Sequence, residues 1–132
     1  MYTEISGATM DKILEVALHT GSHAYGLAEY EDLDYVLTLK ETSGLDFIST
    51  NKLAASAEYQ EDDHLCTSVK VKYLTMVINV VIVKDKATKE HWQYATETMA
   101  KFVKKNPKFK NLIKDKETRI ILFRTFYDIG KE

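Results

Sequence analysis

Two aspartates separated by one residue, Asp32 and Asp34, form the first pattern in the sequence that can do chemistry. They lie at the start of Leu33–Leu39, whose β-branched and aromatic residues are typical of a strand. Alternate side chains of a strand share one face, so the two carboxylates are expected a few ångström apart. Such carboxylates repel each other unless a cation lies between them, and Mg²⁺ commonly binds one or two carboxylates together with substrate phosphates. The pair predicts a magnesium site, and two solvated acids at a strand edge are the alternative.

A glycine and a serine upstream of the aspartates, Gly21 and Ser22, are suited to binding phosphate. Glycine lets the backbone approach an anion closely, and serine offers both a hydroxyl and a backbone N–H. His19 and His23 flank this turn, and they either contact phosphate or make structural hydrogen bonds. The turn and the two carboxylates together predict a site for a phosphate-bearing ligand and a divalent cation.

The order of these motifs resembles the signature of the polymerase-β-like nucleotidyltransferase superfamily, in which Gly-Ser is followed by Asp-x-Asp on a strand. The segment Ala24–Leu27, directly after Gly-Ser, resembles the small predicted nucleotidyltransferases encoded by bacteriophages. Asn79–Val83 and His91–Glu97 are also similar to the phage proteins, and Arg119–Gly130 is similar to their short helical tail. The resemblance touches most of the chain, and the Gly-Ser and Asp-x-Asp motifs are its specific part.

This resemblance implies roles for individual residues. Gly21 and Ser22 would bind the β- and γ-phosphates of a nucleoside triphosphate, with ATP the expected nucleotide. Asp32 and Asp34 would bind Mg²⁺ and orient the α-phosphate for in-line attack by a hydroxyl group. Apart from the resemblance, the strand pattern places Lys70 and Lys72 on one face of a strand expected to neighbour the aspartates, and Lys72 is the expected nucleotide contact that would neutralise developing charge. The implied activity is transfer of a nucleoside monophosphate to a hydroxyl of a protein or an RNA.

One position departs from the pattern of the superfamily. Full members add a third carboxylate from a neighbouring central strand, and the matching position here holds Asn79, the third candidate metal ligand. An amide does not accept a proton at neutral pH and replaces a carboxylate poorly at a second metal. Asp85 has the same strand parity but lies roughly 20 Å further along an extended chain.

Two functions therefore stay open. If one metal ion and a substrate-assisted attack suffice, the protein is a Mg²⁺-dependent nucleotidyltransferase acting on a protein or RNA acceptor. Otherwise it is a catalytically impaired member of the fold that binds a partner protein. Such a protein would be a phage-encoded inhibitor or adaptor of a host protein, or an antitoxin-like module that acts on a toxin.

Other chemistries have less support. His64 and Cys66, with Asp62 and Asp63, match no standard zinc pattern, and the sequence contains neither a Gly-x-Ser-x-Gly elbow nor a P-loop. A basic run with interleaved phenylalanines either binds nucleic acid or triphosphate or forms solvated helix faces. Its lysines are Lys101, Lys104, Lys105, Lys108, Lys110, Lys114 and Lys116.

The strands that must position the site follow from the hydrophobic pattern. Ser68–Tyr73 alternates apolar and polar residues as a half-exposed strand does, and Val77–Val83 is a β-branched run typical of a central strand. Ile13–Leu18 fits either a short strand or the end of a helix. We expect three or four strands in the sheet.

The helices follow from a period of 3.6 residues. Lys89–Lys105 and Glu117–Ile129 each place apolar residues on one face, and Gly130 is the expected C-cap of the second. Asn51–Glu58 contains helix formers and is expected to be helical, and Tyr59–His64 is predicted to form a polar loop. The prediction is an α+β fold in a single nucleotidyltransferase-like domain over residues 1–132, with a small mixed sheet covered by helices and short C-terminal helices.

Composition limits the class of protein. The chain has 132 residues, 45% of them hydrophobic, which is enough for one packed core and excludes a disordered polyelectrolyte. The first 66 residues hold 3 Lys or Arg against 13 Asp or Glu, and the last 66 hold 15 against 7, an asymmetry that favours an anionic partner or a bound cation.

The expected compartment is the cytoplasm, which is the host cytoplasm if a phage encodes the protein. A single cysteine excludes a disulfide scaffold, and the N-terminus lacks the layout of a signal peptide. The longest apolar stretch, Met76–Val83, is too short to cross a bilayer, so no membrane association is expected.

Overall fold

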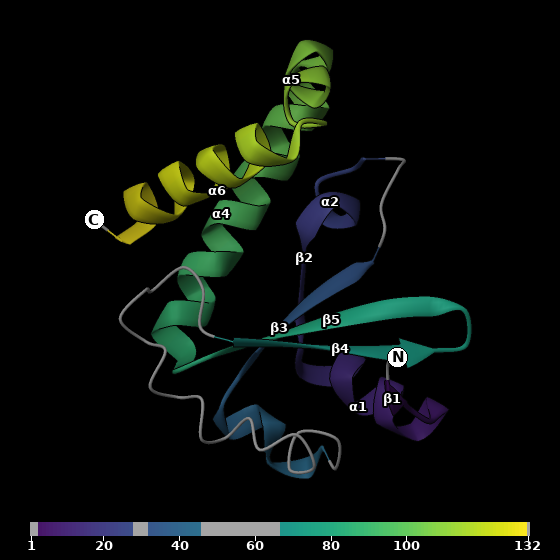
Figure 1. Cartoon of the computed structure of the whole chain (residues 1–132). Helices are drawn as coiled ribbons and strands as arrows, with labels where there is room; N and C mark the ends of the chain where they lie inside the picture. Colours follow the sequence, from purple (N-terminus) through teal and green to yellow (C-terminus); the bar gives the residue numbers. More distant parts are fainter. Residues whose placement is uncertain (1–2, 28–31, 46–66, 132) are drawn as a thin grey trace.

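The fold of the chain is α+β. A computed structural model describes residues 3–27, 32–45 and 67–131. These residues form a five-stranded mixed sheet in the order β1-β4-β5-β3-β2 (Figure 1). The strands are β1 (Thr3–Glu4), β2 (Leu18–Thr20), β3 (Leu33–Thr38), β4 (Thr67–Tyr73) and β5 (Met76–Val83). The expectation of three or four strands is wrong, because two very short strands pair with the edges of the predicted sheet.

The β-branched strand β5 lies in the middle of the sheet, as its sequence predicts. It runs parallel to β3 and antiparallel to β4, while β2 and β1 add an antiparallel and a parallel edge. The β3–β5 register aligns Asp34 with Asn79, and the β4–β5 register aligns Lys70 with the same asparagine. Three adjacent strands therefore bring polar residues to one place on the sheet.

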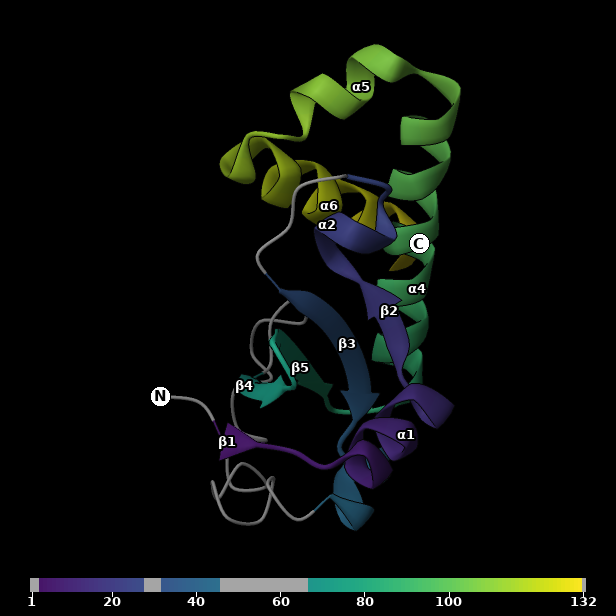
Figure 2. The same ribbon diagram turned by 90° about the vertical axis from the view of Figure 1, so that its right-hand side faces the viewer.

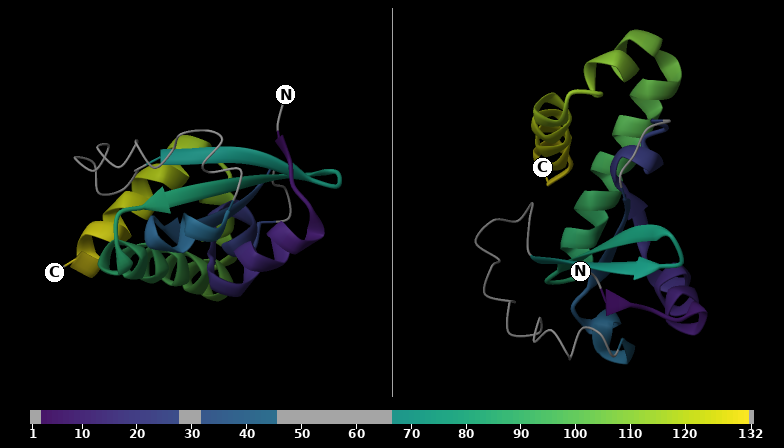
Figure 3. Two further views of the ribbon diagram at one scale, coloured as in Figure 1. Left: turned by 90° about the horizontal axis from the view of Figure 1, so that it is seen from below. Right: turned by 45° about the vertical axis from the view of Figure 1, so that its right-hand side comes forward.

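Helices precede, separate and follow the strands. They are α1 (Gly7–Val16), α2 (Gly21–Ala24), the 3-10 helix η1 (Lys40–Gly44), α4 (Lys86–Lys105), α5 (Pro107–Leu112) and α6 (Lys116–Lys131). The ambiguous segment Ile13–Leu18 contains the end of α1 and the beginning of β2, with Ala17 between them. After α4, the short α5 reverses the chain so that α6 returns alongside α4 (Figure 3).

Each face of the sheet has its own hydrophobic core. On one face, Leu37 and Val80 pack with Met10 and Ile13 of α1. On the other face, Val36, Val81 and Val83 pack with residues of α4 and α6, among them Trp92, Met99, Phe123 and Tyr127. Asp34 and Asn79 have the strand parity of Val36 and Val81, so they belong to the face that α4 and α6 cover.

Capping residues set the bounds of the long helices. Asp85 is the N-cap of α4, where its side chain accepts a hydrogen bond of 2.9 Å from the Thr88 backbone N–H, so α4 begins three residues before the predicted Lys89. At the other end, α4 stops before Asn106, and Pro107 occupies the first turn of α5. The role of Asp85 is therefore structural.

Gly130 is not the C-cap of the last helix. The helix α6 continues through Lys131, and Gly130 lacks the positive φ of a left-handed cap. A side chain at this position would overlap the aromatic ring of Tyr94 on α4. The glycine allows the two helices to pack closely, which helical periodicity alone does not reveal.

Some expectations lie outside the described residues. These are the helix over Asn51–Glu58, the loop over Tyr59–His64, and the weakly supported zinc ligands, which include His64 and Cys66. Within the described part of the chain, none of the helices combines the length and the apolar character needed to cross a membrane.

Candidate functional site

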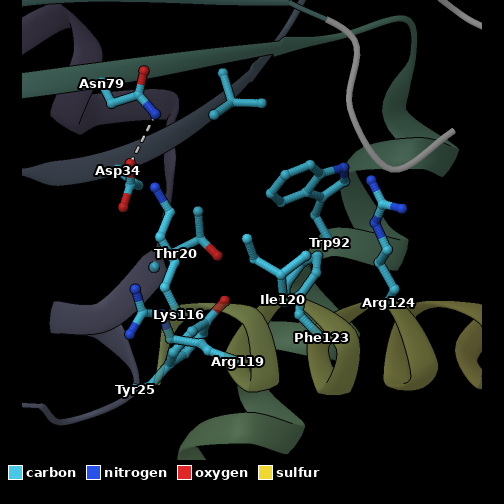
Figure 4. Close-up of a pocket in the computed structure, with 12 residues that line it drawn as sticks. Thr20, Tyr25, Asp34, Asn79, Trp92, Lys116, Arg119, Ile120, Phe123 and Arg124 are labelled. Atoms are coloured by element: carbon cyan, nitrogen blue, oxygen red, sulfur yellow. Dashed lines mark hydrogen bonds between the residues drawn. The ribbon is translucent and has the colours of Figure 1, made fainter. Parts of the chain in front are cut away.

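A hydrogen bond between neighbouring strands holds the central carboxylate of the site. Asn79 Nδ2 on β5 donates to Asp34 Oδ1 on β3 at 2.8 Å (Figure 4). The bond follows from the parallel register that places the two residues opposite each other. The structure thus brings Asp34 together with the residue that occupies the expected third-carboxylate position. In this arrangement Asn79 supports Asp34 as a donor, with its own oxygen buried and without a partner among the described residues.

The glycine of the predicted phosphate turn lies directly against the same carboxylate. Gly21 follows β2 and has a φ of +81°, a conformation that residues with a side chain rarely adopt. A Cβ added to Gly21 would overlap the Asp34 carboxylate, chiefly its Oδ2. The absence of a side chain therefore makes room for Asp34, and the turn and the aspartate form one site.

Ser22 is the second residue of the single-turn helix α2 and is half-buried. Its carbonyl accepts a hydrogen bond of 3.0 Å from the Leu27 backbone N–H, which closes the loop after α2. The helices α2 and α6 both lie at the end of the molecule above β2 and β3 (Figure 2), and the ring of Tyr25, the residue after α2, has its centroid 6.4 Å from that of Phe123 on α6. The turn at Gly21 and Ser22 is thereby fixed between the sheet and the last helix.

The second aspartate, Asp32, lies one residue before β3 and faces a lysine. Its Oδ2 is 3.5 Å from Lys70 Nζ, in an ion pair whose side chains are 22% and 48% exposed. An ion pair this accessible adds little stability, but it places a cation beside the two carboxylates. Lys72, the expected nucleotide contact, pairs in register with Val77, whereas Lys70 pairs with Asn79. The structure thus brings Lys70 rather than Lys72 to the carboxylates.

Burial makes the charged form of Asp34 unfavourable. It raises the pKa of the Asp34 carboxyl from its ordinary 3.8 to about 6, against the opposing effect of the Asn79 hydrogen bond. The Asp32 carboxylate raises this pKa further, while Lys70 and Arg119 lower it. A group shifted toward neutral pH by burial and by a like charge is typical of functional sites. A bound cation would relieve both unfavourable effects.

Asp34 opens onto a pocket between the sheet and α6 with a volume of about 310 Å³. The lining residues are Thr20, Gly21, Tyr25, Asp34, Asn79, Val81, Trp92, Lys116, Arg119, Ile120, Phe123 and Arg124. Figure 4 shows Asp34, Lys116 and Arg119 toward one end, and Trp92 and Phe123 toward the other. The pocket therefore has a charged end and an apolar end.

Three basic residues of α6 face the sheet across this pocket: Lys116, Arg119 and Arg124. The Arg119 guanidinium also donates a hydrogen bond of 3.0 Å to the Ile113 carbonyl oxygen, which holds it near the start of α6. The sequence predicts no role in the site for the two arginines or for Trp92. The helical period locates these residues on α6 and α4, but it does not tell how α6 folds back over the sheet.

The donor set near Asp34 fits one magnesium ion. Asp34 of β3 and Asp32, one residue before the strand, are close enough to interact electrostatically, and Mg²⁺ commonly completes a site of two carboxylates with water and substrate phosphates. Among the described residues, no group of three or more His, Cys, Asp or Glu side chains is placed to bind a metal. The described side chains thus fit one ion shared with a substrate better than a closed protein site.

The histidines beside the turn lie near each other. His19 Nε2 is 3.3 Å from His23 Nδ1, and the ring of His19 stacks on Tyr35 with centroids 5.1 Å apart. Burial, followed by the proximity of His23, lowers the pKa of His19. Along β2, His19 points opposite to Thr20, which lines the pocket, so His19 belongs to the other face of the sheet. This position favours a structural role for His19, through its contacts with His23 and Tyr35, over phosphate binding.

Comparison with protein-family models, with curated proteins and with solved structures gives no match for this chain.

Proposed function

We propose that this protein is a Mg²⁺-dependent nucleotidyltransferase that transfers a nucleoside monophosphate to a hydroxyl group of a protein or an RNA. The observation that carries the proposal is the pocket that Asp34 shares with Lys116 and Arg119. A carboxylate that could bind a metal ion and basic side chains that could bind phosphates, all lining one pocket, suit a metal-bound triphosphate. The resemblance of the Gly-Ser and Asp-x-Asp motifs to nucleotidyltransferases supports the same interpretation.

The residues of the candidate site have separate roles in this proposal. Asp32 and Asp34 hold the ion, and the Asn79 hydrogen bond fixes the orientation of Asp34. Gly21 allows close backbone approach to a phosphate. Lys116 and Arg119 neutralise negative charge on the triphosphate. When bound, Mg²⁺ would polarise the phosphate oxygens and orient the triphosphate.

The proposed reaction is an in-line displacement. The acceptor oxygen forms a bond to the α-phosphorus, the bond from the α-phosphorus to the bridging oxygen breaks, and pyrophosphate leaves. Asn79 has no site that takes up the proton of the acceptor at neutral pH, so the proton passes to water or to a phosphate oxygen. Catalysis then rests on positioning and on electrostatic stabilisation by the charged residues of the pocket.

The second candidate is an interaction protein that keeps the fold without catalysis. The observation that favours it is the asparagine at position 79, which leaves Asp34 as the one acidic residue among the described residues that line the pocket. In that case the partner is a protein, such as a host protein inhibited by a phage or a toxin neutralised by an antitoxin.

The two candidates are separated by a transfer assay. The protein is incubated with labelled nucleoside triphosphates, Mg²⁺ and cell extract, and labelled protein and RNA are resolved by electrophoresis. Transfer by the wild type that is lost in Asp32→Ala/Asp34→Ala supports the enzyme. Asp11→Ala is the matched control, because Asp11 is an exposed acid of α1 on the opposite face of the sheet. If no transfer is found and calorimetry shows no Mg²⁺-dependent binding of any triphosphate, the proposed enzymatic function is wrong and the interaction protein is favoured.

A further inference from the structure

A second pocket lies on α4, outside the candidate site. Its volume is about 380 Å³, and its lining residues are Tyr94, Thr98, Lys101, Phe102 and Lys105. All five belong to α4, and the helical period places them on the side of the helix roughly opposite Trp92, which lines the pocket of the candidate site. These five residues form a surface, the α4 groove, that combines two aromatic rings with two lysines.

The aromatic rings of the α4 groove are both exposed and supported. Tyr94 is 44% exposed and Phe102 is 45% exposed. The Phe102 ring stacks on Phe126 of α6, with the centroids 5.4 Å apart and an angle of 5° between the ring planes. Its centroid is also 5.4 Å from that of Phe109 on α5. Contacts from three helices therefore hold a ring that is nearly half exposed, and such a ring can stack on a flat ligand.

The α4 groove lies in a strongly basic part of the chain. Residues 98–114 contain six lysines and no acidic residue: Lys101, Lys104, Lys105, Lys108, Lys110 and Lys114. None of these lysines forms an ion pair within the described residues. Glu97, one turn before Lys101, instead accepts a hydrogen bond of 3.0 Å from Gln93. Because α5 and the adjoining end of α4 extend beyond the sheet (Figure 1), a large anionic ligand could reach this surface.

Single-stranded RNA matches this combination of charges and rings. Lysines bind the phosphates of a strand, and exposed aromatic rings stack on bases that are not paired with a second strand. An acidic protein or an anionic membrane would supply the negative charge without a regular series of flat rings. Eight residues of helix separate Tyr94 from Phe102, which corresponds to a rise of about 12 Å. The two rings would therefore contact different bases of one strand.

We infer that the α4 groove binds single-stranded RNA, with Tyr94 and Phe102 stacked on bases and with Lys101 and Lys105 bound to phosphates. The inference rests on the proposed function, which leaves a protein or an RNA as the acceptor, and it selects RNA. The helix α5 connects the groove to α6, whose first residue, Lys116, lines the pocket of the candidate site. The basic surface that would hold the acceptor is thus continuous along the chain with the site proposed to bind the triphosphate.

The test measures binding of a fluorescein-labelled oligouridine to the full chain by fluorescence anisotropy, at several salt concentrations and without a nucleoside triphosphate. Lys101→Gln/Lys105→Gln should reduce the slope of log affinity against log salt concentration by about 1.4, because each phosphate contact to a single strand contributes about 0.7. Phe102→Leu keeps an apolar side chain beside Phe126 but removes the flat ring. Its affinity for the oligouridine should therefore fall about fivefold or more.

Lys12→Gln/Lys40→Gln is the matched control for charge, because it removes two exposed lysines from α1 and η1, which lie at the opposite end of the molecule from α5 (Figure 1). It should change the affinity for the oligouridine by less than about twofold, since salt screens distant charges. Heparin and phosphatidylserine vesicles are the control ligands, because they carry negative charge without bases. Their binding should not respond to Phe102→Leu. Thermal unfolding checks that each variant folds.

The outcomes separate the inference from the proposed function. Binding of the oligouridine that both groove variants weaken and the charge control does not supports the inference, even if no transfer is ever detected and the proposed function fails. If the oligouridine does not bind, or if neither groove variant weakens its binding, the inference is wrong, even if a protein is labelled in the transfer assay. An equal loss of heparin or vesicle binding in Phe102→Leu also overturns it, because the ring would then not act by stacking on bases.

Discussion

The Asp34 carboxylate lies where a side chain on Gly21 would begin. The two residues come from different elements, since Gly21 opens α2 and Asp34 is in β3, yet a Cβ on Gly21 would overlap the carboxylate. The contact couples the turn at Gly21, which is predicted to bind phosphate, to the candidate metal ligand. A change in one is therefore expected to disturb the other.

Gly21→Ala is expected to weaken both folding and metal binding. The alanine must adopt a φ of +81° and must displace Asp34, so the free energy of unfolding should fall on the order of 2 kcal/mol or more. Chemical denaturation measures the loss, and the transfer assay or Mg²⁺ calorimetry measures the effect on Asp34.

Gly44→Ala is the matched control for this substitution. Gly44 ends the helix η1, and no atom lies within 4 Å of a Cβ added there. Its replacement should change stability by less than about 1 kcal/mol. Equal losses in the two variants would show that the contact between Gly21 and Asp34 has no special importance.

Asp34 is expected to make the metal-free protein less stable as the pH rises from about 4 to about 6. Its folded-state pKa of about 6 exceeds the ordinary value of 3.8. Between these values the folded protein binds more protons than the unfolded chain, so the free energy of unfolding decreases with increasing pH. After allowance for partial exposure, the contribution is on the order of 2 kcal/mol.

The contribution of Asp34 is isolated by comparing the wild type with Asp34→Asn in urea unfolding without Mg²⁺. Other groups titrate in both proteins, among them Glu41 and Asp85, whose pKa values are lowered and whose effect on stability has the opposite sign. The difference between the two stability profiles therefore reports Asp34. Parallel profiles over this range of pH would contradict a raised pKa.

Replacing the amide at position 79 with a carboxylate is expected to increase the response to Mg²⁺. Asn79→Asp replaces the amide donor, which lies 2.8 Å from Asp34 Oδ1, with a carboxylate that joins those of Asp32 and Asp34. Without metal, the repulsion and the lost hydrogen bond should cost about 2 kcal/mol of stability. With millimolar Mg²⁺, the gain in melting temperature should exceed that of the wild type, because a third carboxylate joins the site.

The control for this variant is Asn79→Leu, which also loses the hydrogen bond but offers no ligand. When a chelator removes metal ions, both variants should be less stable than the wild type. Only the aspartate variant should regain stability with Mg²⁺. If the two respond alike to the metal, position 79 does not adjoin a metal site.

The central strands and the long helices could be predicted because their patterns are long. The β-branched run of β5 and the helical period of α4 each extend over enough residues to identify the element. The strands β1 and β2 contain two and three residues, too few to show a period, and exist only through pairing with β4 and β3. Their formation depends on tertiary contacts.

The residues of the candidate site that lie on the sheet could be predicted from the sequence, but those that α6 contributes could not. Strand parity places Asp32 beside Asp34, but the register that aligns Asn79 with Asp34 is a property of the β3–β5 pairing. Arg119 reaches the pocket only because α5 reverses the chain after Lys105. Contacts that depend on how a helix packs across a sheet leave no periodic signal in the sequence.

The close packing of Gly130 against Tyr94 gives a prediction that separates backbone propensity from packing. Alanine is favoured over glycine within a helix by up to about 1 kcal/mol. In this protein, however, an added Cβ would lie 2.5 Å from Tyr94 Cδ1. Gly130→Ala is therefore expected to lower the free energy of unfolding by about 1 kcal/mol, because Tyr94 or the end of α6 must move.

In a Tyr94→Ala background the obstacle is gone, and Gly130→Ala should instead stabilise α6 by up to about 1 kcal/mol. The change of sign between backgrounds is a coupling energy, measured by urea unfolding of the wild type, both single variants and the double variant. The same packing sets the position of α6, which carries Lys116, Arg119 and Arg124 into the pocket. An effect of Gly130→Ala with the same sign and size in both backgrounds would show that Tyr94 does not limit the approach of the two helices.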